Sequence, residues 1–193
     1  MTTLYLIRHA EADASVHDDA TRPLTEQGSR DAERLAEALG GIRFDSLYSS
    51  PYKRTMDTIT PLATRLGLAV ETVYDLRERR PADVWVEDFW EFMARQWADF
   101  SYKLPGGESL DEVQRRFAAA IEVICRKNAG ETIAISSHGT ALCAALNYYD
   151  KSFGYAEFLK LLYITPFVVR FEFEGDNFLS WEVVEEINDN SRN

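Results

Sequence analysis

Two short apolar stretches of this chain run directly into a histidine, and both histidines are candidates for chemistry. Residues 4–7 read Leu-Tyr-Leu-Ile and lead into Arg8 and His9, and Thr132–Ser136 leads through a second serine to His138. A neutral imidazole can attack an electrophile or carry a proton. The planar fork of donors on Arg8 suits a phosphate or a carboxylate. On residue type alone, this pattern favours a site for an anion.

Two further candidates follow other predicted strand ends. Arg54 comes shortly after Ser49-Ser50-Pro51, and Glu78 follows Leu76-Arg77. If these ends are neighbours, Arg8 and Arg54 can neutralise a phosphoryl group, with His138 as a further donor. His9 can then attack phosphorus while Glu78 protonates the leaving oxygen. Such a set needs neither a metal ion nor a cofactor, so we expect neither.

Glu78 donates a proton only while it holds one, and its neighbours bear on that. Arg77, Arg79 and Arg80 surround it in the sequence and favour the ionised carboxylate, whereas burial and a bound phosphate favour the acid. The three arginines have two interpretations. They form a solvated run of charge, or they bind a second anionic group on the substrate.

The order of the predicted elements explains how these residues could meet. Apolar strands near residues 4–7, 45–50 and 69–73 alternate with helices near 25–39 and 51–66, and we expect Pro61 to kink or divide the second helix. This rhythm favours an α/β fold of three layers, α/β/α, with a mainly parallel central sheet. A hairpin near the C-terminus, strands 167–173 and 178–184, predicts an antiparallel edge. Parallel strands in this arrangement would bring their carboxyl ends to one edge of the sheet, where ligands bind in open sheets.

The length and net charge of the chain limit the number of domains and the kinds of molecule that it can bind. The chain has 193 residues and a formal net charge of −11, so residues 1–193 fit one domain. A chain this acidic has no long-range attraction for nucleic acid or for an anionic membrane. We therefore expect neither as a partner, and a small anionic substrate would need positive charge concentrated locally.

Features outside the candidate site indicate the setting. No apolar run is long enough to span a membrane, and no signal segment opens the chain. Cys125 and Cys143 lie in apolar segments and are interpreted as buried free thiols. A reducing cytoplasm is the simplest location.

One segment, at about 81–105, interrupts the α/β rhythm and is expected to be a helical insertion. It is rich in aromatic residues, from Trp85 through Trp90 and Trp97 to Phe100, at a spacing that covers more than one face of a single helix. Plain packing against the sheet is one interpretation. A lid over the site or a contact in a homodimer is the other.

Taken together and in order, five short motifs resemble the histidine phosphatase superfamily, the phosphoglycerate-mutase-like proteins. The resemblance implies that His9 is a nucleophile that forms a phosphohistidine, that Glu78 is the proton donor, and that Arg8, Arg54 and His138 bind phosphate without a metal. The role of Gly107-Glu108 is left open. The motifs are Leu6-Ile7-Arg8-His9-Ala10-Glu11, Ser49-Ser50-Pro51-x-x-Arg54, Leu76-x-Glu78, Pro105-Gly106-Gly107-Glu108-Ser109 and Ser137-His138-Gly139.

Departures from the family pattern bear on the substrate. Ala10 replaces the glycine of the mutases, and Ala14-Ser15 stands where they carry Trp-Asn, so Ser15 is a phosphate contact or a solvated loop residue. The opening and Arg22-Pro23-Leu24-Thr25 look more like the short phosphohistidine phosphatases, which tend to lack the acid and the Gly-Gly-Glu turn. His17 is expected to be solvated.

Several functions remain open on the sequence. The leading one is a metal-independent phosphatase that hydrolyses small phosphomonoesters through phosphohistidine on His9. Alternatives are a phosphoglycerate-type mutase, a phosphohistidine protein phosphatase and a non-catalytic phosphate-binding module. A metal-dependent hydrolase is disfavoured because no carboxylate stands at a ligand-like helical spacing from His9 or His138.

Overall fold

The computed structural model describes residues 1–84 and 86–184. Six strands form one sheet: β1 (Thr2–Arg8), β2 (Ser46–Ser49), β3 (Val70–Thr72), β4 (Thr132–Ser137), β5 (Phe167–Glu174) and β6 (Asn177–Val183). The α-helices are α1 (Glu26–Leu39), α2 (Lys53–Leu66), α3 (Phe89–Ala98), α4 (Leu110–Lys127), α5 (Gly139–Tyr149) and α6 (Tyr155–Leu161), with one 3-10 turn at Tyr74–Leu76.

The strand order confirms the expected α/β architecture. The order is β3-β2-β4-β1-β5-β6, in which β3, β2, β4 and β1 are parallel. Strand β5 pairs antiparallel with β1, and β6 pairs antiparallel with β5. The parallel part comes from the early β-α-β rhythm, and the final hairpin supplies the antiparallel edge.

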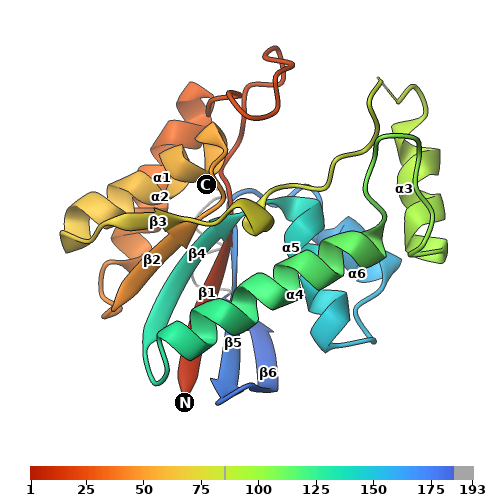
Figure 1. Ribbon diagram of the computed structural model, residues 1–193. Coiled ribbons are helices and arrows are strands. Elements are labelled where there is room, and N and C mark those ends of the chain that lie inside the picture. Colours follow the sequence, from red (N-terminus) through yellow and green to blue (C-terminus); the bar gives the residue numbers. More distant parts are fainter. Residues whose placement is uncertain (85, 185–193) are drawn as a thin grey trace.

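Helices cover both faces of the sheet, because consecutive side chains of each strand point to opposite sides. Leu4 and Leu6 of β1 belong to a core cluster that includes the apolar faces of α4 and α5. Ile7 belongs to the other cluster, with α1 and α2. Figure 1 shows α1 and α2 on one side and α4 and α5 on the other. Among the described helices, none has the length and apolar character needed to cross a bilayer.

Local sequence signals set where several helices begin. The side chain of Thr25 accepts a hydrogen bond from the amide of Gly28 at the start of α1, as its N-cap position predicts. Ser109 and Glu112 form a reciprocal capping box at the start of α4. The expectation for Pro61 is wrong in one respect: α2 continues through it as one helix, Lys53–Leu66.

The aromatic segment forms a shorter helix than expected. Of the described residues in this segment, only Phe89–Ala98 are helical, because the side chain of Asp88 caps the amide of Glu91 and starts α3 there. Trp85 lies outside the described residues. Trp97 stacks on Phe158 of α6 with ring centroids 5.0 Å apart. Figure 1 shows α3 at the far end of α4, beyond the sheet. The packing that was expected against the sheet is therefore made with α6.

Strand register brings the motif-bearing ends together. Arg8 of β1 is paired with Ser137 of β4, and Ser49 of β2 with Ser136. The ladder continues one residue further, since the His9 amide donates to the Ser137 carbonyl at 3.0 Å. His9, Ser50 and His138 therefore follow three adjacent parallel strands at one sheet edge.

Candidate active site

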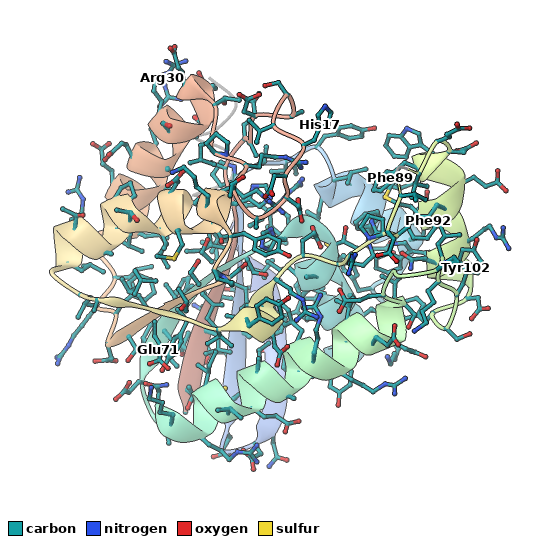
Figure 2. All side chains as sticks on the ribbon, turned by 45° about the horizontal axis from the view of Figure 1, so that its top comes forward. His17, Arg30, Glu71, Phe89, Phe92 and Tyr102 are labelled. Carbon is teal, nitrogen blue, oxygen red and sulfur yellow. The ribbon has the colours of Figure 1, made fainter. Side chains whose placement is uncertain are left out.

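A cavity of about 790 Å³ opens at the carboxyl edge of the sheet. Its polar lining comes from the loop after β1, the start of α2, the segment after the 3-10 turn and the start of α5. Val84, Val86 and Phe89 add an apolar wall. Figure 2 looks onto this region, with His17 on the loop after β1 and Phe89 at the start of α3. The polar lining residues include His9, Asp19, Arg22, Tyr52, Arg54, Glu78, Arg79 and Thr140.

His9 has one ring nitrogen prepared for attack. Its Nδ1 lies 2.7 Å from the carbonyl oxygen of Ala10, and a carbonyl only accepts, so Nδ1 carries the proton. Nε2 then holds a lone pair, which accepts a hydrogen bond from Nε of Arg54 at 3.1 Å. Burial, reinforced by the charge of Arg54, lowers the pKa of His9 to about 3. The imidazole is therefore neutral and nucleophilic near neutral pH.

Arg54 is a buried cation next to that nucleophile. Only 2% of the residue is exposed, and burial lowers its pKa, while Asp19 acts in the opposite direction. Its Nη2 lies 3.1 Å from the carboxylate of Asp19, and its Nη1 donates to the Asp19 carbonyl at 2.5 Å. The guanidinium also lies over the ring of Tyr52, 5.3 Å from its centroid. These contacts hold Arg54 against His9.

His138 lies behind the cavity wall, in edge contact with His9. The two ring centroids are 5.3 Å apart, and His138 is fully buried. Its Nε2 lies 2.8 Å from the hydroxyl of Ser50, and its Nδ1 has no hydrogen-bond partner among the described residues. Burial, with the nearby charge of Arg54, places its pKa well below the ordinary value. His138 is therefore a neutral ring with one nitrogen, Nδ1, that has no partner among the described residues.

Arg8 supports the site from below and does not line the cavity. Its Nη1 donates to the carbonyls of Leu161, Leu162 and Ile164 at 3.0, 2.8 and 2.8 Å. The guanidinium packs on Gly139, where an added Cβ would lie 3.0 Å from Nε. Nε itself has no partner in the described part of the chain. One edge of Arg8 is thus anchored to the loop after α6, and the other faces the first residue of α5.

Glu78 sits on the N-terminus of α5. Its carboxylate accepts from the amides of Thr140 and Ala141 at 3.1 and 3.0 Å, and from the amide of Arg79 at 2.7 Å. The first amides of a helix have no partner within it and attract negative charge. Glu78 occupies this anion-binding position, in the same cavity as His9 and Arg54.

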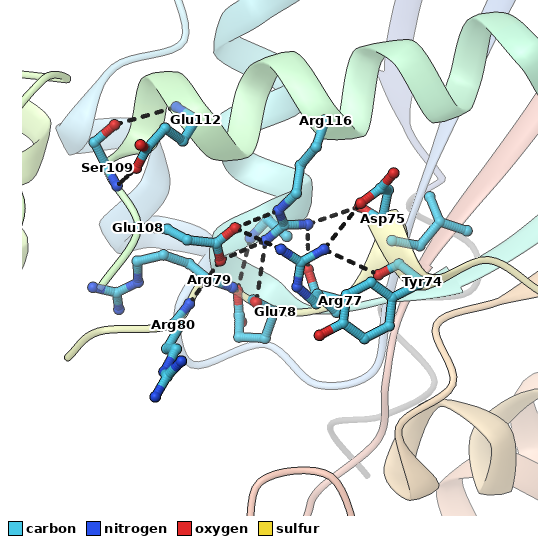
Figure 3. A network of polar contacts seen from close by, with 12 residues as sticks. Tyr74, Asp75, Arg77, Glu78, Arg79, Arg80, Glu108, Ser109, Glu112 and Arg116 are labelled. Atoms are coloured by element: carbon cyan, nitrogen blue, oxygen red, sulfur yellow. Dashed lines mark hydrogen bonds and ion pairs between the residues drawn. The ribbon is translucent and has the colours of Figure 1, made fainter. Parts of the chain in front are cut away.

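A network around Glu108 positions the segment that carries Glu78. Arg116 of α4 donates to Glu108 at 2.8 Å, to the Arg77 carbonyl at 2.8 Å and to the Glu78 carbonyl at 3.1 Å. Glu108 also accepts from the Arg77 side chain and the Arg80 amide. Figure 3 shows Arg116 reaching from its helix into this cluster.

The network depends on charge and on a close backbone approach. Burial alone would raise the pKa of Glu108, but the hydrogen bond and charge of Arg116, with Arg77, hold it below the ordinary value. A Cβ at Gly107 would lie 2.1 Å from the carbonyl oxygen of Pro81, so only glycine lets the turn come this close. This gives a structural role to Gly107-Glu108, which the sequence left open.

Some of the lining residues carry no signal in the sequence that marks them as functional. Asp19 and Tyr52 hold Arg54, yet Asp19 is one of several acidic residues in its loop, and Tyr52 is an unspecified position of its motif. Ser15 is exposed and does not line the cavity. His17 is exposed, as expected, and lies at the rim. Only proximity in the fold distinguishes these residues.

Basic side chains gather around the cavity, as a binding site for an anion needs in a chain of net negative charge. Arg22 and Arg54 line the cavity with Arg79 and Arg80, and Arg8 lies behind its wall. No group of three or more His, Cys, Asp or Glu side chains within residues 1–84 and 86–184 is arranged to hold a metal ion.

Comparison with known proteins identifies the family. A model of the histidine phosphatase superfamily (branch 1) matches residues 4–184. Phosphoserine phosphatase 1 of Hydrogenobacter thermophilus is 29% identical over 150 residues, 72% of this chain and 71% of that protein. A Yersinia pestis protein named "Probable phosphoglycerate mutase GpmB" is 31% identical over 160 residues, 76% and 74% of the two chains. The solved structure of Bacillus stearothermophilus YhfR superimposes with a TM-score of 0.73 at 27% identity, covering 95% and 96% of the chains. The chain belongs to the histidine phosphatase superfamily.

Proposed function

We propose that this enzyme hydrolyses small phosphomonoesters through a phosphohistidine at Nε2 of His9. The observation that carries the proposal is the pair of contacts made by the His9 ring: Nδ1 faces the Ala10 carbonyl and Nε2 faces Nε of Arg54. These contacts assign the proton to Nδ1 and the lone pair to Nε2. A neutral, oriented imidazole next to buried positive charge is what nucleophilic attack on a phosphoryl group requires.

In the first half-reaction, Nε2 of His9 forms a bond to phosphorus while the bond from phosphorus to the ester oxygen breaks. Arg54 turns its donors from Asp19 to the phosphoryl oxygens and compensates their charge. His138 adds a donor if the Ser50 hydroxyl donates to its Nε2, because the proton of the neutral ring is then on Nδ1. Glu78, in its acid form, gives its proton to the leaving oxygen.

In the second half-reaction, water attacks the phosphohistidine. Glu78, now ionised, takes a proton from that water, and the bond between phosphorus and Nε2 breaks. Phosphate leaves, and the proton held by Glu78 restores its acid form. The hydrogen bonds from the α5 amides stabilise the ionised carboxylate between the two steps.

The direct test is to trap the intermediate. Mixing wild-type enzyme with a phosphomonoester and quenching rapidly in alkali should give a peptide containing His9 that carries one phosphoryl group. His9→Ala should give neither this peptide nor turnover, with a loss of about 10³-fold or more. Normal turnover by His9→Ala would rule the proposal out.

A mutase is the second candidate, favoured by the similarity to the protein named phosphoglycerate mutase. The two reactions share the first half-reaction and differ in what accepts the phosphoryl group. Phosphoenzyme mixed with unlabelled phosphoglycerate separates them: release of inorganic phosphate supports hydrolysis, and transfer to the second hydroxyl of the acceptor supports a mutase.

We also propose a reducing cytoplasm as the setting, since Cys125 and Cys143 are buried free thiols. A homodimer remains a prediction. It is supported by two exposed aromatic residues, Trp90 and Tyr163, whose rings contact each other. Analytical ultracentrifugation of the full chain tests it.

A further inference from the structure

Arg79 is a buried cation that lines the cavity and forms no ion pair among the described residues. Only 3% of the residue is exposed. Its Nη1 donates to the side-chain oxygen of Gln96 at 2.8 Å. Its Nε has no partner within the described part of the chain, and no ion pair there joins Arg79 to a carboxylate. Burial lowers the pKa of Arg79, and the charges of Glu78, Glu108 and Asp19 offset this only in part. A buried charge without a directly bonded anion is costly, so this arrangement needs a reason.

The neighbouring arginines are neutralised within the protein. Arg77 pairs with Asp75 and Glu108, at 3.0 and 2.9 Å, and Arg80 pairs with Asp83. The run Arg77-Glu78-Arg79-Arg80 is therefore not one solvated cluster. Arg77 belongs to the Glu108 network (Figure 3), and Arg80 lies at the surface. Arg79 alone of the three is buried with its charge unpaired.

The structure also holds the Arg79 guanidinium in place. The central guanidinium carbon, Cζ, lies 5.3 Å from the ring centroid of Phe89 and 4.9 Å from that of Phe92, both in cation–π range. Gln96 is itself fixed, since its amide nitrogen donates to the carbonyls of Tyr102 and Glu108 at 3.1 and 2.9 Å. Figure 2 shows Phe89 and Phe92 beside each other. The neutral amide orients Arg79 without neutralising it.

The unused side of the guanidinium has a defined shape. With Nη1 bonded to Gln96, the free edge consists of Nε and Nη2, two parallel N–H donors. A planar carboxylate, with two oxygens and a single charge, matches such an edge in a bidentate contact. A phosphate can make the same two contacts, but it carries more negative charge than the single charge of Arg79 balances.

We propose that Arg79 binds a carboxylate on the substrate, so that the preferred substrates are phosphorylated hydroxy acids or amino acids. This inference rests on the proposed function, since it places the phosphoryl group at His9. Glu78 adjoins Arg79 in the chain, and both line the cavity that contains His9. In the proposed complex, a small molecule that carries both groups places its phosphoryl group at His9 and its carboxylate at Arg79.

Two matched pairs of substrates test the proposal. 3-Phosphoglycerate differs from glycerol 3-phosphate, and phosphoserine from phosphoethanolamine, essentially by the carboxylate. Wild-type enzyme should give the higher kcat/KM for the carboxylated member of each pair. Arg79→Gln should lower kcat/KM for that member by about 10- to 100-fold, the range for a hydrogen bond to a charged group. It should leave the other member within about threefold.

Two further variants complete the design. Arg115→Gln removes the same charge from an exposed side chain of α4, 74% accessible. It should leave kcat/KM unchanged for both members of each substrate pair. Arg79→Lys keeps the charge and loses the bidentate edge, so it should lose part of the discrimination even if Arg79→Gln fails to fold. Equal slowing of both members of a pair by Arg79→Gln or Arg79→Lys would overturn the proposal, as would wild-type enzyme that does not discriminate.

Binding measurements separate this proposal from the proposed function. In His9→Ala, which cannot form the phosphohistidine, calorimetry should show tighter binding of 3-phosphoglycerate than of glycerol 3-phosphate. Arg79→Gln in that background should remove the difference. If no phosphohistidine forms in wild type but the difference persists, the proposed function fails and the carboxylate site stands. If phosphohistidine forms and the difference is absent, the carboxylate site fails.

Discussion

Arg54 donates from Nε to Nε2 of His9 across 3.1 Å, so the nitrogen proposed to attack phosphorus is covered by the cation proposed to bind phosphate. The contact fixes the lone pair of His9 in direction. It also means that an incoming phosphoryl group enters between the two side chains. Arg54 then exchanges its contacts with Asp19 for contacts with the substrate.

Arg54→Lys should therefore be a severe change. A lysine supplies a point charge in place of the fork that reaches both His9 and a phosphoryl oxygen. We expect kcat/KM to fall by about 10²-fold or more, the usual scale for loss of a donor that stabilises transition-state charge. Lys53→Arg is the matched control, because Lys53 is exposed and pairs only with Asp57 among the described residues. An Arg54→Lys enzyme with wild-type kcat/KM would place Arg54 outside the reaction.

The two histidines of the site, His9 and His138, should make the protein less stable in acid. The pKa of His9 is about 3 in the folded chain, against an ordinary value of 6.5, and that of His138 is also lowered. Between these values the unfolded chain binds protons that the folded chain does not. The free energy of unfolding should thus fall as pH drops below about 6.5, by at most about 1.4 kcal/mol per pH unit for each histidine.

Urea titrations at pH 7, 6, 5 and 4 measure this slope without substrate. His9→Gln should be less sensitive to pH than wild type, since one of the two histidines is gone. An unchanged slope would mean that His9 is protonated in the native state, contrary to its assigned tautomer. For the same reason, kcat/KM plotted against pH should not fall near pH 6.5, because His9 is still neutral there and can attack.

Removal of the acid should depend on the leaving group. An alkoxide leaves poorly without a proton, whereas p-nitrophenolate leaves readily. Glu78→Gln should slow hydrolysis of alkyl phosphates by about 10²- to 10⁴-fold, the usual range for general acid catalysis, and should largely spare p-nitrophenyl phosphate. Steady-state kinetics on both substrates decide the point, and equal slowing of the two would assign the proton to another group.

Glu108→Gln should have the same kinetic effect as Glu78→Gln, but a weaker one. It removes the charge that holds Arg77, Arg116 and the Arg80 amide, so the segment carrying Glu78 loosens. The free energy of unfolding should fall by about 1–3 kcal/mol, and alkyl phosphates should lose more rate than p-nitrophenyl phosphate. Glu112→Gln is the control: Glu112 caps α4 and pairs with Lys103, and in the described part of the chain it makes no hydrogen bond or ion pair with the Glu78 segment. If both variants slow the two substrates alike, Glu108 supports the fold only.

The sequence by itself determined the class of fold and the main chemical groups. Short apolar runs that end in polar residues predict parallel strands, and parallel strands place their carboxyl ends at one edge. That geometry is why the sequence alone predicts His9, Arg54 and Glu78 as site residues and why they line one cavity. The capping residues Thr25 and Ser109 were equally visible, because an N-cap is a local interaction between near neighbours in the chain.

Only the tertiary structure decided how those groups are arranged. The partners of Arg8 lie more than 150 positions away, at Leu161–Ile164, and Arg54 reaches back to Asp19 in a loop whose acidic residues look alike in the sequence. The contrast between Arg77 and Arg79 is the clearest case. Both are arginines beside Glu78, yet one is neutralised by Glu108 and the other is buried beside Phe89 and Phe92 with its charge unpaired. Burial and pairing depend on which distant side chains pack nearby, and no local pattern encodes that.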